Sequence, residues 1–153
     1  MLQTTICFLV LKNHVLLGLK KRGFGVGKWN GIGGKRDASD HTITDTARRE
    51  LKEEIGVEAL ALTRVATLDF HFETQLDWNQ TVSIFLCRDW NGDAQESEEM
   101  KPQWFWQESL PYNEMWEDDQ HWLPLVLAGR RLKGAFWFNK ESKIIKFEIE
   151  FLS

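Results

Sequence analysis

Residues 42–56 carry a helical repeat that needs a surface to pack against. Apolar residues recur there every four positions, the spacing of one helix face, at Ile43, Ala47, Leu51 and Ile55. Thr42 and Asp45 resemble a capping box, and Gly56 is a natural stop in the left-handed conformation. We therefore expect a helix over these residues, with its apolar stripe directed toward a sheet.

Apolar and β-branched runs on both sides of this helix predict the strands of that sheet. They occupy residues 4–11, 15–20, 60–72, 81–88, 134–138 and 144–151. A second helix is expected over 119–129, and the polar, acidic residues 91–103 read as a surface loop. The order of these elements predicts a single domain, 1–153, of the α/β or α+β class, with a mixed central sheet flanked by helices.

The composition excludes several classes of protein. Apolar residues make up 42% of the 153 positions, which is enough for a core and too many for a disordered chain. The net charge of −4 argues against a duplex nucleic-acid partner, and no apolar run is long enough to span a membrane. Cys7 and Cys87 lie in apolar runs and are expected to be reduced, buried thiols. We expect a cytoplasmic monomer.

Three carboxylates of the first helix suggest a metal site. Glu50, Glu53 and Glu54 are related by i, i+3 and i+4, so they share one helix face and repel each other. A hard divalent cation would turn this repulsion into attraction, and oxygen ligands are what Mg²⁺ prefers, with Mn²⁺ as an alternative ion. The competing interpretation is a solvated, charged face with Arg48 and Lys52 as neighbours.

A glycine-rich segment precedes this helix. Residues 22–35 hold six glycines in fourteen positions, which is typical of a loop with tight turns and close backbone approach. Gly33 and Gly34 would let a backbone carbonyl join the metal shell, and Arg49 could hold one carboxylate by a bidentate contact. The loop favours the metal site over the solvated face.

The segment GGKRDASDHTITDTARRELKEEIGV resembles the signature of the Nudix hydrolase family. That signature is Gly, five residues, Glu, seven residues, then Arg-Glu-apolar-x-Glu-Glu-x-Gly-apolar. Residues 49–57 match every fixed position of its second half. In the first half, Asp40 stands where the count from Gly34 requires Glu, and His41 begins a stretch that is one residue too long. In the family, this glutamate mainly supports the loop and the helix.

The resemblance extends through LLGLKKRGFGVGKWNGIGGK, ESEEMKPQWF and MWEDDQHWLPL to the animal MutT-type branch of the family. It implies an αβα sandwich and Mg²⁺-dependent hydrolysis of oxidised purine nucleoside triphosphates, such as 8-oxo-dGTP, to the monophosphate and pyrophosphate. It implies metal ligands at the Gly33 carbonyl, Glu50, Glu53, Glu54 and Glu99. It implies a nucleotide pocket lined by Thr5, Lys20, Phe24, Asn30, Gly34, Lys35, Phe70, Phe72, Trp116, Asp118 and Asp119.

The implied pocket residues also suit a purine chemically. Trp116 offers a face on which a base can stack. Asp118 and Asp119 are adjacent acids that would share a proton, so that one donates to a purine oxygen while the other accepts from a ring N–H. Asn30 offers both a donor and an acceptor. The competing role for the two aspartates is capping of the second helix.

For catalysis, we expect a water activated by the metal to attack one phosphorus atom in line. Glu53 or Glu99 would take its proton, Arg49 would steady a carboxylate, and Lys20 would neutralise phosphate charge.

Simpler roles compete with several of these assignments. They are a solvated loop for Glu99, a solvated strand end for Lys20, and ordinary core packing for Phe70 and Phe72. His71 and His121 are expected to be surface or core histidines. The functional alternatives are hydrolysis of ADP-ribose or a dinucleoside polyphosphate, and a nucleotide-binding Nudix fold without catalysis.

Overall fold

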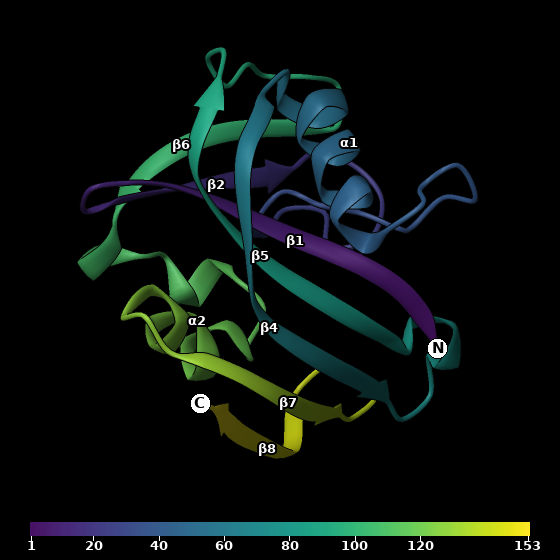
Figure 1. The fold of residues 1–153 in the computed structure, drawn as a ribbon. Coiled ribbons are helices and arrows are strands. Elements are labelled where there is room, and N and C mark those ends of the chain that lie inside the picture. Colours follow the sequence, from purple (N-terminus) through teal and green to yellow (C-terminus); the bar gives the residue numbers. More distant parts are fainter.

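A mixed β-sheet lies between two α-helices in the computed structural model, which describes residues 1–153 (Figure 1). The strands are β1 (Leu2–Leu11), β2 (His14–Lys20), β3 (Trp29–Asn30), β4 (Glu58–Phe72), β5 (Gln80–Asn91), β6 (Met100–Trp106), β7 (Arg131–Phe138) and β8 (Ile144–Leu152). The α-helices are α1 (Ile43–Ile55) and α2 (Asp119–Leu127), and single turns of 3₁₀-helix are η1 (Leu76–Trp78), η2 (Gln107–Ser109) and η3 (Tyr112–Glu114). The predicted layered class is confirmed.

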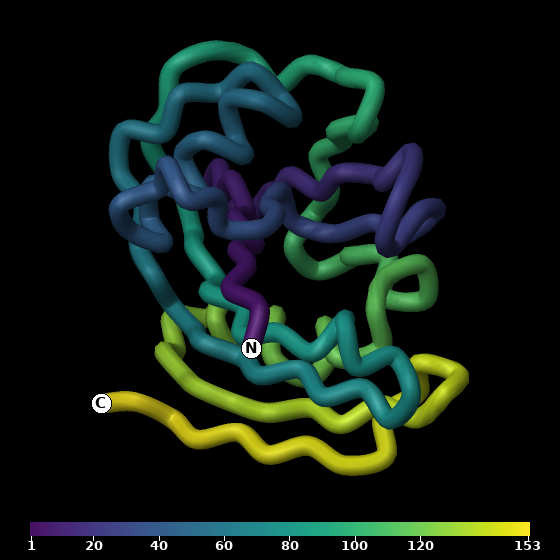
Figure 2. The backbone as a smooth tube through the Cα atoms, turned by 90° about the vertical axis from the view of Figure 1, so that its right-hand side faces the viewer, coloured from purple at the N-terminus to yellow at the C-terminus, as the bar shows by residue number.

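The strands follow the order β3-β2-β1-β5-β4-β7-β8, and β6 pairs with β2. β1 runs parallel to β5, and β4 runs parallel to β7, while the other pairs are antiparallel. Figure 2 shows the β7–β8 hairpin along one end of the molecule and the glycine-rich loop beside the segment that precedes α2. The glycine-rich loop and the segment before α2 are far apart in the sequence, and the fold places them side by side.

β1 separates two buried clusters because its side chains alternate between the faces of the sheet. Phe8 and Val10 belong to the cluster that includes the α2 residue Trp122. Cys7 and Leu9 belong to the cluster that packs under α1. Both faces of the strand are therefore covered, which explains why β1 reads as a nearly continuous apolar run.

Helix α1 begins and ends where the sequence predicts. The Asp45 N–H donates to the Thr42 hydroxyl at 3.2 Å, and the Thr42 N–H donates to the Asp45 carboxylate at 3.0 Å. Gly56 ends the helix with a φ of 72°, a conformation that costs little without a Cβ. Leu51 and Ile55 are buried against the sheet, and the helix therefore turns its carboxylate face away from that core.

Two strands lie where the sequence predicted loops. β6 begins at Met100, inside the predicted loop 91–103, and pairs with the whole of β2. The polar, acidic residues before it suggested a loop, and its Pro102 is tolerated because β6 has a neighbouring strand on one side only. β3 lies in the glycine-rich loop and consists of Trp29 and Asn30, which pair with Leu19 and Gly18.

Cys7 and Cys87 are both buried and free, as the sequence predicted. Burial raises the pKa of the Cys7 thiol, so this side chain stays protonated and inert. The helices of the structure are all too short or too polar to cross a membrane.

Candidate active site

One cavity of about 640 Å³ brings together most of the residues that the sequence singled out. This volume lies in the range of small-molecule sites. Every predicted metal, catalytic and nucleotide-contacting residue lines it except Arg49. Its wall also contains residues that were not predicted, including Thr4, Lys28, Asp77, Trp78 and Gln80.

The acidic end of the cavity centres on Glu54 of α1, which is 6% exposed. Its Oε2 atom has no hydrogen-bond partner, and the Lys20 Nζ atom lies 4.0 Å from its Oε1 atom. Burial, together with the charge of Glu50, raises the pKa of Glu54 to about 7, although Lys20 opposes the shift. A buried carboxylate oxygen without a partner is costly unless it gains a proton or a cation. Lys20 therefore faces this acidic end and is not a free strand-end lysine.

Arg49 lies outside the cavity, and its hydrogen bonds connect the segments that line the cavity. Its Nη1 atom donates to Glu50 at 2.9 Å and to Glu53 at 3.2 Å. Its Nη2 atom donates to the Lys35 carbonyl at 2.9 Å, on the glycine-rich loop. Two further bonds reach Asp40, from Nε at 3.1 Å and from Nη2 at 2.9 Å. One guanidinium thus connects the loop to two carboxylates of the helix.

Asp40, the residue at which the signature fails, supports this connection. Its carboxylate also accepts from the Thr46 hydroxyl at 2.8 Å and from the Asp37 N–H at 2.9 Å. The hydrogen bond from Arg49, with these others, holds the pKa of Asp40 well below its usual range. The loop and the helix are therefore joined by an aspartate in this chain, and the Asp40 N–H donates to the Asp37 carbonyl at 2.9 Å in a turn of the loop.

The glycine-rich loop lies directly against the carboxylates. A Cβ at Gly34 would stand 2.7 Å from the Glu50 carboxylate, and a Cβ at Gly33 would overlap the Thr5 carbonyl oxygen at 1.7 Å. The Thr5 N–H donates to the Gly34 carbonyl at 2.9 Å, which fixes the loop on β1. Larger side chains at either glycine would push the loop away from α1.

The acidic side chains do not converge as a ready-made metal-binding group. Glu50 and Glu53 are turned toward Arg49, and Glu99 accepts a 2.7 Å hydrogen bond from the Arg22 Nε atom. The types of donor nevertheless fit a hard divalent cation, since carboxylates and the backbone of Gly33 line the same cavity as the unpartnered oxygen of Glu54.

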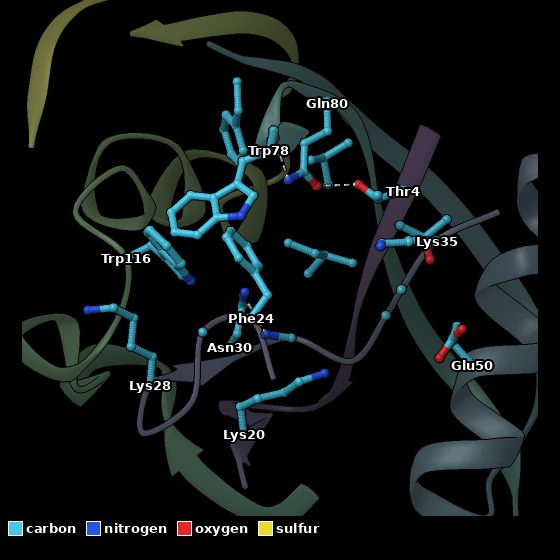
Figure 3. A pocket seen from close by; sticks show the side chains of 18 of the residues that line it. Thr4, Lys20, Phe24, Lys28, Asn30, Lys35, Glu50, Trp78, Gln80 and Trp116 are labelled. Atoms are coloured by element: carbon cyan, nitrogen blue, oxygen red, sulfur yellow. Dashed lines mark hydrogen bonds between the residues drawn. The ribbon is translucent and has the colours of Figure 1, made fainter. Parts of the chain in front are cut away.

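The other end of the cavity is aromatic (Figure 3). The Phe24 ring stacks on Trp116 with centroids 5.1 Å apart and contacts Trp78 edge-on at 4.6 Å. The Lys28 Nζ atom lies 5.3 Å from the centre of a Trp116 ring. In this structure the Phe24 ring therefore occupies a face of Trp116 on which a base could stack. Phe24 is 44% exposed, and it lies between Gly23 and Gly25, which both have positive φ angles.

Asp118 and Asp119 are both buried at this end. The Trp122 Nε1–H donates to Asp118 Oδ2 at 2.7 Å, while Asp118 Oδ1 and Asp119 Oδ2 have no partner. Burial raises the pKa of both carboxyl groups, and the charge of Asp118 raises that of Asp119 further. Asp118 forms no capping hydrogen bond with α2, so the capping role that competed for it is wrong.

The remaining predicted residues form the walls or lie outside the site. Phe70 and Phe72 line the cavity and also contact Phe138, so packing and lining coincide. Asn30 enters through β3, and its side-chain oxygen accepts from the Gly31 N–H at 2.8 Å. His71 stacks on Trp137, and the His121 ring lies tilted against Phe147, both outside the cavity.

Comparisons with known proteins identify relatives that cover nearly the whole chain. A family model described as the NUDIX domain matches residues 1–126. A Danio rerio protein named oxidized purine nucleoside triphosphate hydrolase is 42% identical over 148 residues, which is 95% of this chain and 92% of the relative. A Mus musculus protein of the same name is 39% identical over 145 residues, with the same two shares, 95% and 92%.

The fold also matches a solved structure. The crystal structure of a MutT protein from Bacillus halodurans superposes with a TM-score of 0.84 at 22% identity, and the match covers 98% of each chain. At this identity the likeness concerns the fold, and it agrees with the predicted αβα sandwich.

We predict that Glu54→Gln stabilises the metal-free protein at high pH. The raised pKa means that the folded state binds more protons than the unfolded state between pH about 4.3 and 7, so wild-type stability falls as pH rises through this window. Unfolding by urea in the presence of a chelator should show Glu54→Gln gaining about 3–4 kcal/mol over wild type at pH about 8 relative to pH about 4.

The exposed Glu58→Gln serves as the control and should show no such pH-dependent gain. A stability difference between Glu54→Gln and wild type that does not change with pH would refute the account of this buried carboxylate.

Proposed function

The chain belongs to the Nudix family, and on this premise we propose that it hydrolyses oxidised purine nucleoside triphosphates, such as 8-oxo-dGTP, to the monophosphate and pyrophosphate. One observation carries the proposal: a single cavity is lined by the α1 carboxylates and by Trp116, Asp118 and Asp119. The α1 carboxylates would hold the metal that a triphosphate requires. Trp116 and the two aspartates offer the stacking face and the hydrogen-bonding groups that suit a purine. The names of the Danio rerio and Mus musculus relatives agree with this substrate class.

Nudix hydrolases generally use divalent metals, and we propose Mg²⁺ for this chain. The residues that would hold it are the Gly33 carbonyl, Glu50, Glu53, Glu54 and Glu99. When bound, the ion would polarise the phosphate oxygens and lower the pKa of water. Its positive charge would also satisfy the unpartnered oxygen of Glu54, which supports this end of the cavity as the phosphate end.

The residues of the chain have distinct roles in this scheme. Arg49 holds Glu50 and Glu53 at the edge of the loop and acts by positioning them. Lys20 faces the same end and would offset the charge of the triphosphate. Glu53 is exposed and Glu99 is half-buried, and each is held by an arginine, so either can accept the proton of the attacking water. Substituting Glu53 and Glu99 one at a time would show which of them is the general base.

At the other end, the two aspartates would read the base. Burial and the charge of Asp118 raise the pKa of Asp119, so Asp119 is the member of the pair that stays protonated. Its carboxyl O–H would donate a hydrogen bond to a purine oxygen. The free Oδ1 atom of Asp118 would accept from a ring N–H. An oxidised guanine carries both groups. Trp116 would stack on the base once Phe24 moves aside.

We predict that the protein releases pyrophosphate from 8-oxo-dGTP in the presence of Mg²⁺, faster than from dGTP. Glu54→Gln and the substitution of the true general base, Glu53→Gln or Glu99→Gln, should each lower kcat by about a hundredfold or more, since general-base catalysis alone contributes about 10²–10⁴-fold. Chelation of the metal should abolish turnover.

Glu58→Gln is the matched control, because Glu58 is exposed and outside the cavity. Preferential hydrolysis of ADP-ribose over every purine triphosphate would overturn the substrate proposal. Nucleotide binding without any turnover would mean that the chain is a binder.

We also predict that Trp116→Ala raises KM for 8-oxo-dGTP much more than it lowers kcat. Stacking on one aromatic ring is worth roughly 1–3 kcal/mol per base, so we expect about a tenfold to hundredfold rise in KM. Trp106→Ala removes a 57% exposed tryptophan that does not line the cavity and should leave KM unchanged. A similar KM for Trp116→Ala and wild type would exclude stacking on this ring.

A further inference from the structure

Gln80 and Thr4 place polar side chains on a face of the sheet that is otherwise largely apolar. Gln80 begins β5, between Leu2 of β1 and Phe70 of β4. The residues that follow it in the same row of β5 are all buried in the cluster beneath α2, at Val82, Ile84 and Leu86. Packing in this apolar row does not require a polar side chain. Gln80 is half-buried and lines the cavity instead.

Two hydrogen bonds hold the carboxamide of Gln80 in one orientation. The Thr4 hydroxyl donates to its Oε1 atom at 2.8 Å, and its Nε2 atom donates to the Trp78 carbonyl at 3.0 Å. A flipped amide would turn its oxygen toward the Trp78 carbonyl, and two acceptors cannot share a hydrogen bond. Thr4 is only 6% exposed, so its hydroxyl has little access to water as an alternative partner.

The oriented amide keeps unused hydrogen-bonding capacity. A carboxamide has two N–H donors and an oxygen with two lone pairs, and each of the two bonds uses one of these. One N–H and one lone pair of Gln80 therefore remain for a molecule in the cavity. In Figure 3, Gln80 and Asn30 lie on opposite sides of the Phe24 ring, so the amide approaches the aromatic end from a different side.

We propose that Gln80, oriented by Thr4 and the Trp78 carbonyl, is a specificity-determining residue that selects purines presenting a polar edge to it. This inference rests on the proposed function. A polar substituent on the base would pair with the free N–H or lone pair. A methyl group at the same place would bury the amide without a partner, which disfavours alkylated purines.

The test compares wild type with Gln80→Met, which keeps the length of the side chain and removes its polar atoms. Two ratios of kcat/KM are measured: 8-oxo-dGTP over O6-methyl-dGTP, and 2-hydroxy-dATP over N6-methyl-dATP. One hydrogen bond in a buried site corresponds to roughly fivefold to tenfold, so at least one ratio should fall by about fivefold or more in the variant. If both ratios change by less, the proposal is overturned.

Thr4 provides a matched pair of controls for the orientation of the amide. Thr4→Ser keeps the hydroxyl and should preserve both ratios, whereas Thr4→Val should shift the affected ratio in the same direction as Gln80→Met. Equal shifts in Thr4→Ser and Thr4→Val would overturn the role of the hydroxyl.

The same selectivity is also measured without turnover, as dissociation constants of the four corresponding monophosphates. A wild-type protein that hydrolyses none of the triphosphates would refute the proposed function, while the monophosphate ratios would still decide the role of Gln80. Normal turnover with unchanged ratios in Gln80→Met would refute only the role of Gln80.

Discussion

The guanidinium of Arg49 is the contact on which the acidic end of the cavity depends. It donates to Glu50 and Glu53 on its own helix, to the Lys35 carbonyl on the glycine-rich loop and to Asp40. Charge-assisted bonds in a planar fork fix both distance and orientation, which a lysine could not do. Because the loop is held in this way, the carboxylate of Glu50 and the backbone of Gly34 lie within contact distance of each other.

The sheet then determines how far the acidic end lies from the aromatic end. α1 packs on one face of the sheet and α2 packs on the other. Residues of both helices line the same cavity. A nucleoside triphosphate has the same polarity, with negative charge at one end and a flat ring at the other. Burial raises the pKa of a carboxyl group at each end: Glu54 would exchange its proton for a cation, whereas Asp119 would keep its proton.

The sequence predicted the structural features that depend on residues close together in the chain. The caps and apolar stripe of α1 are set within fifteen residues, and the structure has them as expected. β6 was missed because its pairing with β2 is a long-range contact and its composition resembles a loop. Asp40 fails the family pattern by residue type and spacing, but its carboxylate still reaches Arg49. Thr4 and Gln80 gave no signal, since only the sheet register shows that they share one cavity wall.

The account depends most on the α1 carboxylates as the place where a divalent ion binds, and the affinity of the nucleotide-free protein for Mn²⁺ tests this directly. Electron paramagnetic resonance at pH about 8 should show that Glu54→Gln weakens Mn²⁺ binding by about tenfold or more, as the loss of a metal-site carboxylate does. Asp118→Asn, at the aromatic end, should bind Mn²⁺ as wild type does. Equal affinity of wild type and Glu54→Gln would contradict the account, because the ion would then bind without the buried carboxylate of α1.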